Sequence, residues 1–162
     1  MSRESCPNPA LVATCVVTMR NAVNKTSKRI LIADDDPVVR HLLTAIVRKE
    51  GYEAVAVDDG REAYRILQSD ADFRAGIFDM IMPHLEGLDI IRYMNTEKRL
   101  QRIPVMMISS EADLHLMSES FTAGAAVFLA KPFNPDQFQT TLRILLANKN
   151  APEGGDSNDL AS

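Results

Sequence analysis

Short apolar runs alternate along the chain with longer segments of helical periodicity. Five runs of four or five residues are largely apolar, as expected for strands buried on both faces of a parallel sheet. The predicted strands are residues 29–33, 53–57, 75–78, 105–108 and 126–130. Strands that alternate with helices predict an α/β fold, in which right-handed crossovers place helices on both faces of one sheet.

A segment with apolar residues three and four positions apart follows each predicted strand, which predicts five helices. The helices begin near Pro37, Gly60, Gly87, Asp113 and Pro135, and the last one extends to about Ala147. Asp36 fits the N-cap of the first helix because a proline follows it at the first helical position. The fourth helix is predicted to carry Leu114, Met117 and Phe121 as its apolar face.

The alternating pattern spans residues 28–147, which we interpret as one folded domain. Residues 1–27 are predicted to be a poorly ordered extension. Its apolar run at 10–17 resembles a signal peptide, but the run is short and no clear small-residue cleavage site follows it. Translation that starts at Met19 is a second explanation of this extension. Residues 148–162 are polar, contain Gly and Pro, and are predicted to be a disordered tail.

The composition narrows the class of protein. The chain has 162 residues, of which 46% are hydrophobic and 25% charged, as in a soluble domain with a proper core. The net charge of −4 argues against general nucleic-acid binding. Cys6 and Cys15 provide neither a zinc spacing nor a disulfide framework, which fits a reduced, cytoplasmic setting. The sequence has no apolar run long enough to span a bilayer, so no membrane contact is predicted.

Polar residues directly follow four of the five predicted strands. These residues are Asp34, Asp35, Asp79, Ser109 and Lys131. The carboxyl ends of parallel strands meet at one edge of a sheet, where ligands bind in open α/β folds. If strands one, three, four and five are neighbours, the five side chains converge at that edge.

The residue types in this set suit phosphoryl transfer to a carboxylate. Clustered carboxylates repel one another, and Mg²⁺, which prefers carboxylate and carbonyl oxygens, relieves the repulsion. A carboxylate can be the nucleophile and form an aspartyl phosphate. Lys131 would bring positive charge to the transferred group, and Ser109 a hydrogen-bond donor. Each residue alone also fits a simpler role in a turn, a helix start or a loop, but the whole set at the strand ends favours a site.

Four motifs occur in order at these strand ends. They are residues 30–37 (ILIADDDP), 79–83 (DMIMP) with Gly87, 108–111 (ISSE) and 131–133 (KPF). With these motifs, residues 28–147 resemble the receiver domain of two-component response regulators, in particular the single-domain chemotaxis regulators. The resemblance implies a flavodoxin-like, doubly wound parallel sheet of five strands in the order 2-1-3-4-5, with helices on both faces.

The resemblance also implies an acceptor and a metal site. Asp79 would be the phosphoryl acceptor. Asp34, Asp35 and Asp79 would bind Mg²⁺ together with the backbone carbonyl of Ile81. Many members of the family carry a polar residue where this chain has Ile81. An apolar side chain cannot orient a hydrolytic water by hydrogen bonding, so we predict slow self-dephosphorylation unless Glu111 or a partner assists.

The resemblance further implies a conformational switch next to the acceptor. Ser109 would be the hydroxyl that turns toward the phosphoryl group, and Phe128 the aromatic residue that responds with it. Lys131 would pair with the phosphoryl group, and the Lys131–Pro132 peptide bond is predicted to be cis. The response would shift a two-state equilibrium at the face formed by the fourth helix, fifth strand and fifth helix of the domain.

The expected function is therefore a signalling switch and not an enzyme. The donor would be a histidine kinase or a histidine phosphotransfer protein, and the output would be contact with a downstream target protein. No direct DNA binding is expected, because the sequence shows no helix-turn-helix after residue 147. Homodimerisation on phosphorylation stays open. Two alternatives are a phosphorylation-independent interaction module and an Asp-nucleophile phosphohydrolase, although such hydrolases usually have a second Asp where this chain has Ile81.

Overall fold

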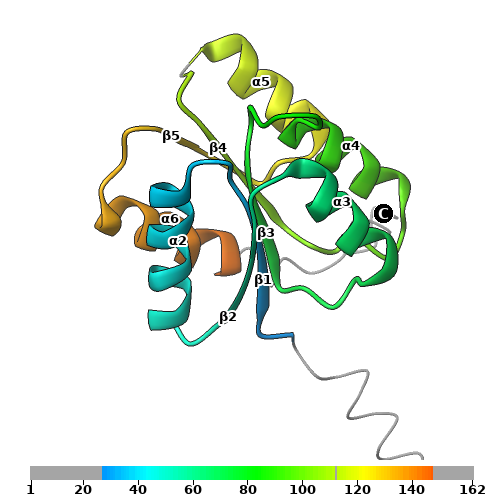
Figure 1. Cartoon of the computed structure of the whole chain (residues 1–162). Coiled ribbons are helices and arrows are strands. Elements are labelled where there is room, and N and C mark those ends of the chain that lie inside the picture. The colour runs from blue at the N-terminus through cyan, green and yellow to red at the C-terminus, as the bar shows by residue number, and fades with distance from the viewer. Residues whose placement is uncertain (1–26, 112, 148–162) are drawn as a thin grey trace, which may run out of the picture.

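The computed structural model describes residues 27–111 and 113–147, and Figure 1 shows how their elements are arranged. The predictions for residues 1–26 and 148–162 concern residues outside the described ranges. Strands and helices alternate: β1 Arg29–Ala33, α2 Pro37–Lys49, β2 Glu53–Val57, α3 Gly60–Ser69, β3 Ala75–Asp79, α4 Gly87–Thr96, β4 Val105–Ser109, α5 Leu114–Ala123, β5 Val127–Ala130 and α6 Pro135–Ala147. The predicted strands agree with these bounds to within one residue.

The strands form one parallel sheet in the order β2-β1-β3-β4-β5, which confirms the predicted fold. β1, β3 and β4 form the middle of the sheet and are almost wholly buried, whereas β2 and β5 are the partly exposed edges. Asp79 pairs with Ile108, and Ser109 pairs with Ala130. The carboxyl ends of these strands therefore lie side by side, as the convergence of their polar residues requires.

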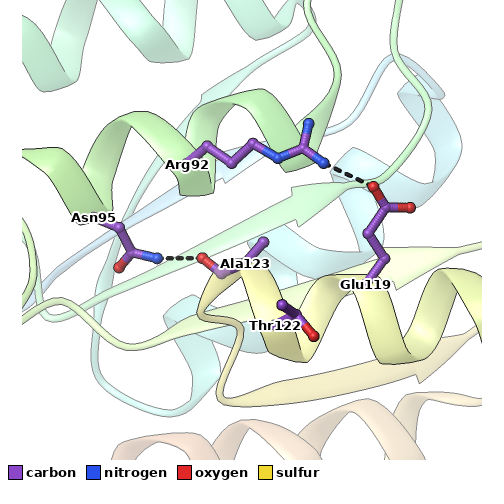
Figure 2. Close-up of a pocket in the computed structure, with 5 residues that line it drawn as sticks. All are labelled: Arg92, Asn95, Glu119, Thr122 and Ala123. Carbon is purple, nitrogen blue, oxygen red and sulfur yellow. Dashed lines mark hydrogen bonds and ion pairs between the residues drawn. The ribbon is translucent and has the colours of Figure 1, made fainter.

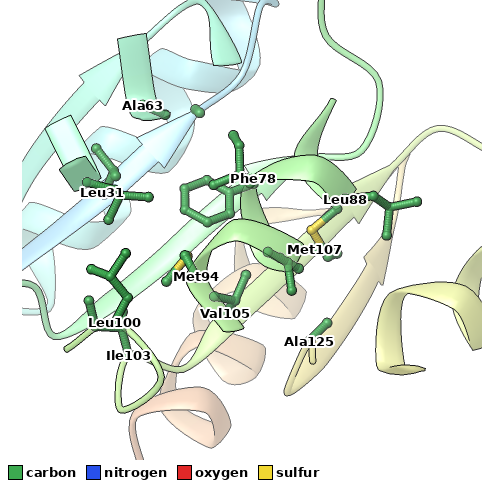
Figure 3. Close-up of a cluster of buried hydrophobic side chains, with 14 of the residues drawn as sticks. Leu31, Ala63, Phe78, Leu88, Met94, Leu100, Ile103, Val105, Met107 and Ala125 are labelled. Carbon is green, nitrogen blue, oxygen red and sulfur yellow. The ribbon is translucent and has the colours of Figure 1, made fainter. Parts of the chain in front are cut away.

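Helices cover both faces of the sheet, and each face has its own hydrophobic core. α2 and α6 pack on one face through residues such as Leu43 and Phe138. α3 and α4 pack on the other face, where Phe78 and Met107 of the sheet meet Leu88 and other apolar side chains (Figure 3). The sheet edge between these two helical layers is where a ligand can approach the strand ends.

The predicted apolar face of α5 is wrong. Leu114 is 80% exposed and Phe121 is 46% exposed, although both were expected to pack inward. The helix instead contacts the core through Leu116 and Ala123, with the buried Ser120 between them. The hydroxyl of Ser120 donates a hydrogen bond to the carbonyl of Leu116 at 2.7 Å, so a polar residue can occupy the buried face. Leu114 and Phe121 thus lie on the exposed surface of α5, whereas Met117 is half-buried.

The ends of the helices follow their capping residues. Asp36 caps α2 by accepting hydrogen bonds from the backbone amides of Val38 and Val39, as the sequence predicts. Gly124 ends α5 with φ of 114°, a left-handed conformation that favours glycine. Within the described ranges, the structure has no helix of the length and apolarity that a bilayer crossing needs.

Candidate functional site

Three carboxylates gather at the carboxyl edge of the sheet. Asp34 follows β1 and is 1% exposed, and Asp79 ends β3 and is 6% exposed. Asp35, which directly follows Asp34, is exposed. One oxygen from each of the three carboxylates lies within 4.8 Å of the others. The structure therefore brings together the three acidic residues that the sequence predicts.

Lys131 reaches this cluster from the segment after β5. Its Nζ lies 3.1 Å from Oδ2 of Asp34 and 3.2 Å from Oδ2 of Asp79. Its backbone amide donates to the carbonyl of Ser109 at 2.7 Å, which ties the lysine to the end of β4. The Lys131–Pro132 peptide bond is cis, as predicted. Lys131 thus pairs with two of the three carboxylates.

Burial and charge shift the pKa of each buried group in the cluster. Burial, with the nearby charge of Asp34, raises the pKa of Asp79 to about 6. Burial also raises the pKa of Asp34. Two groups oppose this rise: the backbone amide of Asp36, which donates to Asp34 Oδ1 at 2.9 Å, and Lys131. Burial opposes the charged form of Lys131, but its two carboxylate partners outweigh that effect and raise its pKa. The negative charge of the cluster is therefore only partly balanced.

The donor set fits a hard divalent cation. Oδ2 of Asp34 is buried and, among residues 27–111 and 113–147, has no hydrogen-bond partner of acceptable geometry, although Lys131 lies close to it. Carboxylate oxygens from three residues, one of them open to water, match the preference of Mg²⁺ for oxygen ligands with several waters retained. Ile81, whose carbonyl is the fourth predicted ligand, lies two residues after Asp79 and has a side chain that is 46% exposed.

Ser109 and Phe128 lie beside the cluster. Ser109 is buried at the end of β4, and its Oγ accepts a hydrogen bond from the backbone amide of Glu111 at 3.1 Å. The hydroxyl hydrogen remains available to donate. Phe128 is half-buried on β5, where it packs against the core on the α3–α4 side. These positions are compatible with the predicted switch roles.

Two contacts at the site were not foreseen. Arg40 of α2 donates from Nη1 to the backbone carbonyl of Asp34 at 2.7 Å. A Cβ added to Gly87 would lie 2.4 Å from the carbonyl oxygen of Asp79, so this glycine permits a close approach. The sequence marks Gly87 as a helix start and as part of the motif that begins at Asp79, but it does not indicate this close approach. The contact of Arg40 joins residues six positions apart across a turn and leaves no pattern in the sequence.

A separate cavity of about 410 Å³ lies between α4 and α5 (Figure 2). Arg92 and Glu119 form an ion pair of 2.7 Å across it, and the side-chain amide of Asn95 donates to the carbonyl of Ala123. These polar groups are partnered with one another, and none of the residues predicted for phosphoryl transfer lines the cavity. The carboxyl edge of the sheet is therefore the better candidate site.

A family model and several known proteins are similar to most of the chain. The family model described as "response regulator receiver domain" matches residues 30–143. A curated relative, chemotaxis protein CheY1 of Helicobacter pylori, is 29% identical over 119 residues, which cover 73% of this chain and 96% of that protein. Rice two-component response regulator ORR5 is 31% identical over 124 residues, 76% of this chain and 91% of that protein.

Solved structures of response regulators and receiver domains are similar to this chain. The chemotaxis response regulator CheY4 of Vibrio cholerae aligns with a TM-score of 0.69 at 29% identity, covering 75% of this chain and all of that one. The receiver domain of a sensor histidine kinase from Pseudomonas aeruginosa, solved with a magnesium ion coordinated in its active site cleft, aligns with a TM-score of 0.67 at 26% identity. That alignment covers 75% of this chain and 98% of the other.

Proposed function

The chain belongs to the response regulator receiver domain family, and we propose that it is a phosphorylation-dependent switch that accepts a phosphoryl group on Asp79. The proposed receiver domain spans residues 28–147, and the matched residues 30–143 lie within it. The observation that carries the proposal is the almost buried Asp79, which shares Lys131 with Asp34 and lies in one cluster with Asp34 and Asp35. Such a domain transmits a signal and catalyses only its own phosphorylation and dephosphorylation.

Asp79 is the proposed nucleophile. Lys131 contacts its Oδ2, so the other carboxylate oxygen is the one that attacks phosphorus. As the new O–P bond forms, the P–N bond of the donor phosphohistidine breaks. The electron pair stays on the imidazole nitrogen, which then takes a proton from solvent. Lys131 remains beside the acceptor carboxylate, where its charge favours the extra negative charge of the product.

Asp34, Asp35, Asp79 and the carbonyl of Ile81 would hold Mg²⁺. When bound, Mg²⁺ would neutralise charge on the oxygens of the transferred phosphoryl group. The magnesium ion in the similar Pseudomonas aeruginosa receiver domain supports this assignment. The carboxylates themselves gain from it, because their mutual repulsion in a buried site is relieved.

The proposed switch begins with Ser109. Its hydroxyl turns to donate to a phosphoryl oxygen and gives up the hydrogen bond from the amide of Glu111. Phe128 responds on β5, and the change reaches the face formed by α5, β5 and α6. The exposed Leu114 and Phe121 on α5 support an output contact there, because exposed apolar side chains favour a protein partner.

A histidine kinase or a histidine phosphotransfer protein is the proposed donor, in the cytoplasm, and a downstream target protein is the proposed receiver of the signal. DNA is not a proposed partner, and phosphorylation-driven homodimerisation is compatible with the exposed α5 surface. The 46% exposed Ile81 supports slow self-dephosphorylation, since an apolar side chain two residues after Asp79 cannot orient a hydrolytic water by hydrogen bonding. An aspartyl phosphate that lasts only seconds in the isolated protein would contradict this last point.

The test of the proposed function is the intact mass of the protein after incubation with Mg²⁺ and acetyl phosphate. We expect one added phosphoryl group in the wild type, none without Mg²⁺, and none in Asp79→Asn. Asp136→Asn, a matched substitution at an exposed position in the first turn of α6, should behave as the wild type. If the wild type binds Mg²⁺ but neither takes up a phosphoryl group nor binds beryllofluoride, the result would instead favour an interaction module that works without phosphorylation.

A further inference from the structure

Arg40 holds the peptide unit that joins the first two carboxylates of the cluster. Its Nη1 donates to the backbone carbonyl of Asp34 at 2.7 Å. The residue is half-buried in α2, and its own backbone amide donates to the carbonyl of Asp36 at 2.9 Å. Both ends of Arg40 are therefore anchored to the turn that contains Asp34, Asp35 and Asp36.

The three carboxylates are held in different ways. Oδ1 of Asp34 accepts from the backbone amide of Asp36, and Oδ2 of Asp79 accepts from Lys131. Across residues 27–111 and 113–147, the structure records no hydrogen bond or ion pair to the carboxylate of Asp35, which is exposed. The place of Asp35 in the cluster therefore depends on the direction of its backbone.

A peptide unit is planar, so fixing its carbonyl oxygen also fixes its N–H and the following Cα. By holding the carbonyl of Asp34, Arg40 sets the direction in which Asp35 leaves the backbone. We propose that Arg40 is a positioning residue for the metal site: its guanidinium keeps the carboxylate of Asp35 within reach of Asp34 and Asp79. This inference rests on the proposed function, because it concerns the Mg²⁺ that serves the same reaction.

A positioning role and a purely electrostatic role for Arg40 predict opposite changes in Mg²⁺ affinity when the residue is replaced. Removing a cation near three carboxylates should tighten Mg²⁺ binding, since less positive charge then repels the metal ion. Losing a residue that positions a metal ligand should weaken binding, and outer contacts of metal ligands typically change metal affinity by about 10- to 100-fold. The direction of the change in Mg²⁺ affinity therefore separates the two roles.

The experiment compares Arg40→Met with Arg48→Met, which makes the same change of charge at an exposed position in the last turn of the same helix. Isothermal titration with Mg²⁺ should give a Kd about tenfold higher than wild type for Arg40→Met. Arg48→Met should bind Mg²⁺ like the wild type. In metal-free protein, the NMR amide signal of Asp35 should shift in Arg40→Met alone, while signals of the core strands stay in place.

Phosphoryl uptake gives a second readout. The uptake rate of Arg40→Met should fall at limiting Mg²⁺ and recover at saturating Mg²⁺, because the acceptor Asp79 is intact. A residue needed only for folding would not show such recovery. If Arg40→Met does not fold, Arg40→Lys takes its place: it keeps the charge but loses the long planar guanidinium, so Mg²⁺ binding should still weaken.

Failure of the inference is distinguishable from failure of the proposed function. If the wild type takes up a phosphoryl group with Mg²⁺ but Arg40→Met binds Mg²⁺ as tightly as Arg48→Met, or more tightly, the positioning role is wrong and the function stands. If the wild type neither binds Mg²⁺ nor takes up a phosphoryl group, the proposed function is wrong, and the role of Arg40 is overturned with it.

Discussion

The two ends of helix α2 carry carboxylates in opposite electrostatic surroundings. At its amino end, Asp34, Asp35 and Asp79 form a cluster in which Lys131 contacts Asp34 and Asp79. Burial raises the pKa of both Asp34 and Asp79. At its carboxyl end, Glu50 accepts hydrogen bonds from Nε and Nη2 of Arg143, at 3.1 and 3.0 Å, and another from Gln139. These partners, with Arg143 first, lower the pKa of Glu50.

The difference separates a stabilising contact from a functional one. Glu50 has its charge matched by an arginine from α6, so it joins two helices and leaves nothing for a ligand to supply. The cluster at the amino end holds more negative charge than Lys131 can balance. Unbalanced charge lowers the stability of the metal-free protein and provides the driving force for cation binding. The following predictions test this comparison.

The largest expected effect comes from the backbone packing at the site. Gly87→Ala would place a Cβ 2.4 Å from the carbonyl oxygen of Asp79 and 2.7 Å from Cε of Met107, so the end of β3 must move. We expect the free energy of unfolding to fall by about 3 kcal/mol or more in a urea titration. The control is Gly51→Ala just past α2, where nothing lies within 4 Å but φ is +88°, and where we expect a loss of about 1 kcal/mol. Equal losses would show that the site end is not more tightly packed.

Removing the shared cation is the next largest change. Lys131→Met leaves Asp34 and Asp79 without their ion-pair partner, and we expect the metal-free protein to lose about 2–3 kcal/mol at pH 7. The loss should shrink at pH 5, because the carboxylates can then take up protons. Urea titrations at both pH values measure it, with the exposed Lys98→Met as control. A loss that is the same at both pH values would contradict the account.

The raised pKa of Asp79 predicts a pH dependence of known sign. The folded-state pKa of about 6 lies above the ordinary value of 3.8, so the folded protein holds this proton more tightly than the unfolded chain. The contribution of Asp79 to stability is unfavourable above pH 6 and disappears as the pH falls below about 4. The shift sets a limit of about 3 kcal/mol. We expect Asp79→Asn to be more stable than wild type at pH 7.5, because the variant buries no charge at this position. The gain should be about 1–2 kcal/mol, below the limit, because the amide forms a weaker contact with Lys131 than the carboxylate does.

Urea titrations of metal-free wild type and Asp79→Asn across this pH range measure the difference. The two proteins should approach equal stability as the pH falls below 3.8, because the wild-type carboxyl then becomes protonated in the unfolded chain as well as in the folded protein. An Asp79→Asn variant that is less stable than wild type at pH 7.5 would contradict the sign of the shift.

The smallest effect is expected at the other end of α2. Glu50→Gln removes the ion pair with Arg143 on the surface, where solvent screens the interaction, so the melting temperature should fall only slightly. The effect should fade as the pH drops through the lowered pKa of Glu50, because the wild type then loses the same charge. Mg²⁺ affinity, measured by titration, should not change. A change in Mg²⁺ affinity would show that the two ends of α2 are coupled.

The sequence predicted the strands and the acidic residues that follow them because both depend on local patterns, whereas the strand order was implied by the resemblance to receiver domains. Apolar runs that end in Asp34, Asp79 and Ser109 fix the strand ends, and the parallel topology then brings those ends together. The orientation of α5 could not be predicted in this way. A short helix with apolar residues on more than one side is turned by its tertiary contacts, which here bury Ser120 and leave Phe121 exposed.

The contacts that refine the site were also beyond the sequence. The hydrogen bond from Arg40 to the carbonyl of Asp34 depends on how the turn after β1 folds back on α2. The close approach of Gly87 to Asp79 depends on where α4 lies against the sheet. The spacing of residues in the sequence predicts neither contact. Each contact involves a backbone atom whose position is set by the whole fold.

The most direct test of the central claim is the melting temperature of three proteins with and without Mg²⁺ at pH 7.5. The account predicts that Mg²⁺ stabilises the wild type and Glu50→Gln to the same extent. A ligand at 100 times its Kd adds about 2.7 kcal/mol to folding stability. Asp79→Asn should start from a higher melting temperature and respond little to Mg²⁺. The account would be contradicted if Mg²⁺ left the wild type unchanged, or if it stabilised Asp79→Asn as much as the other two.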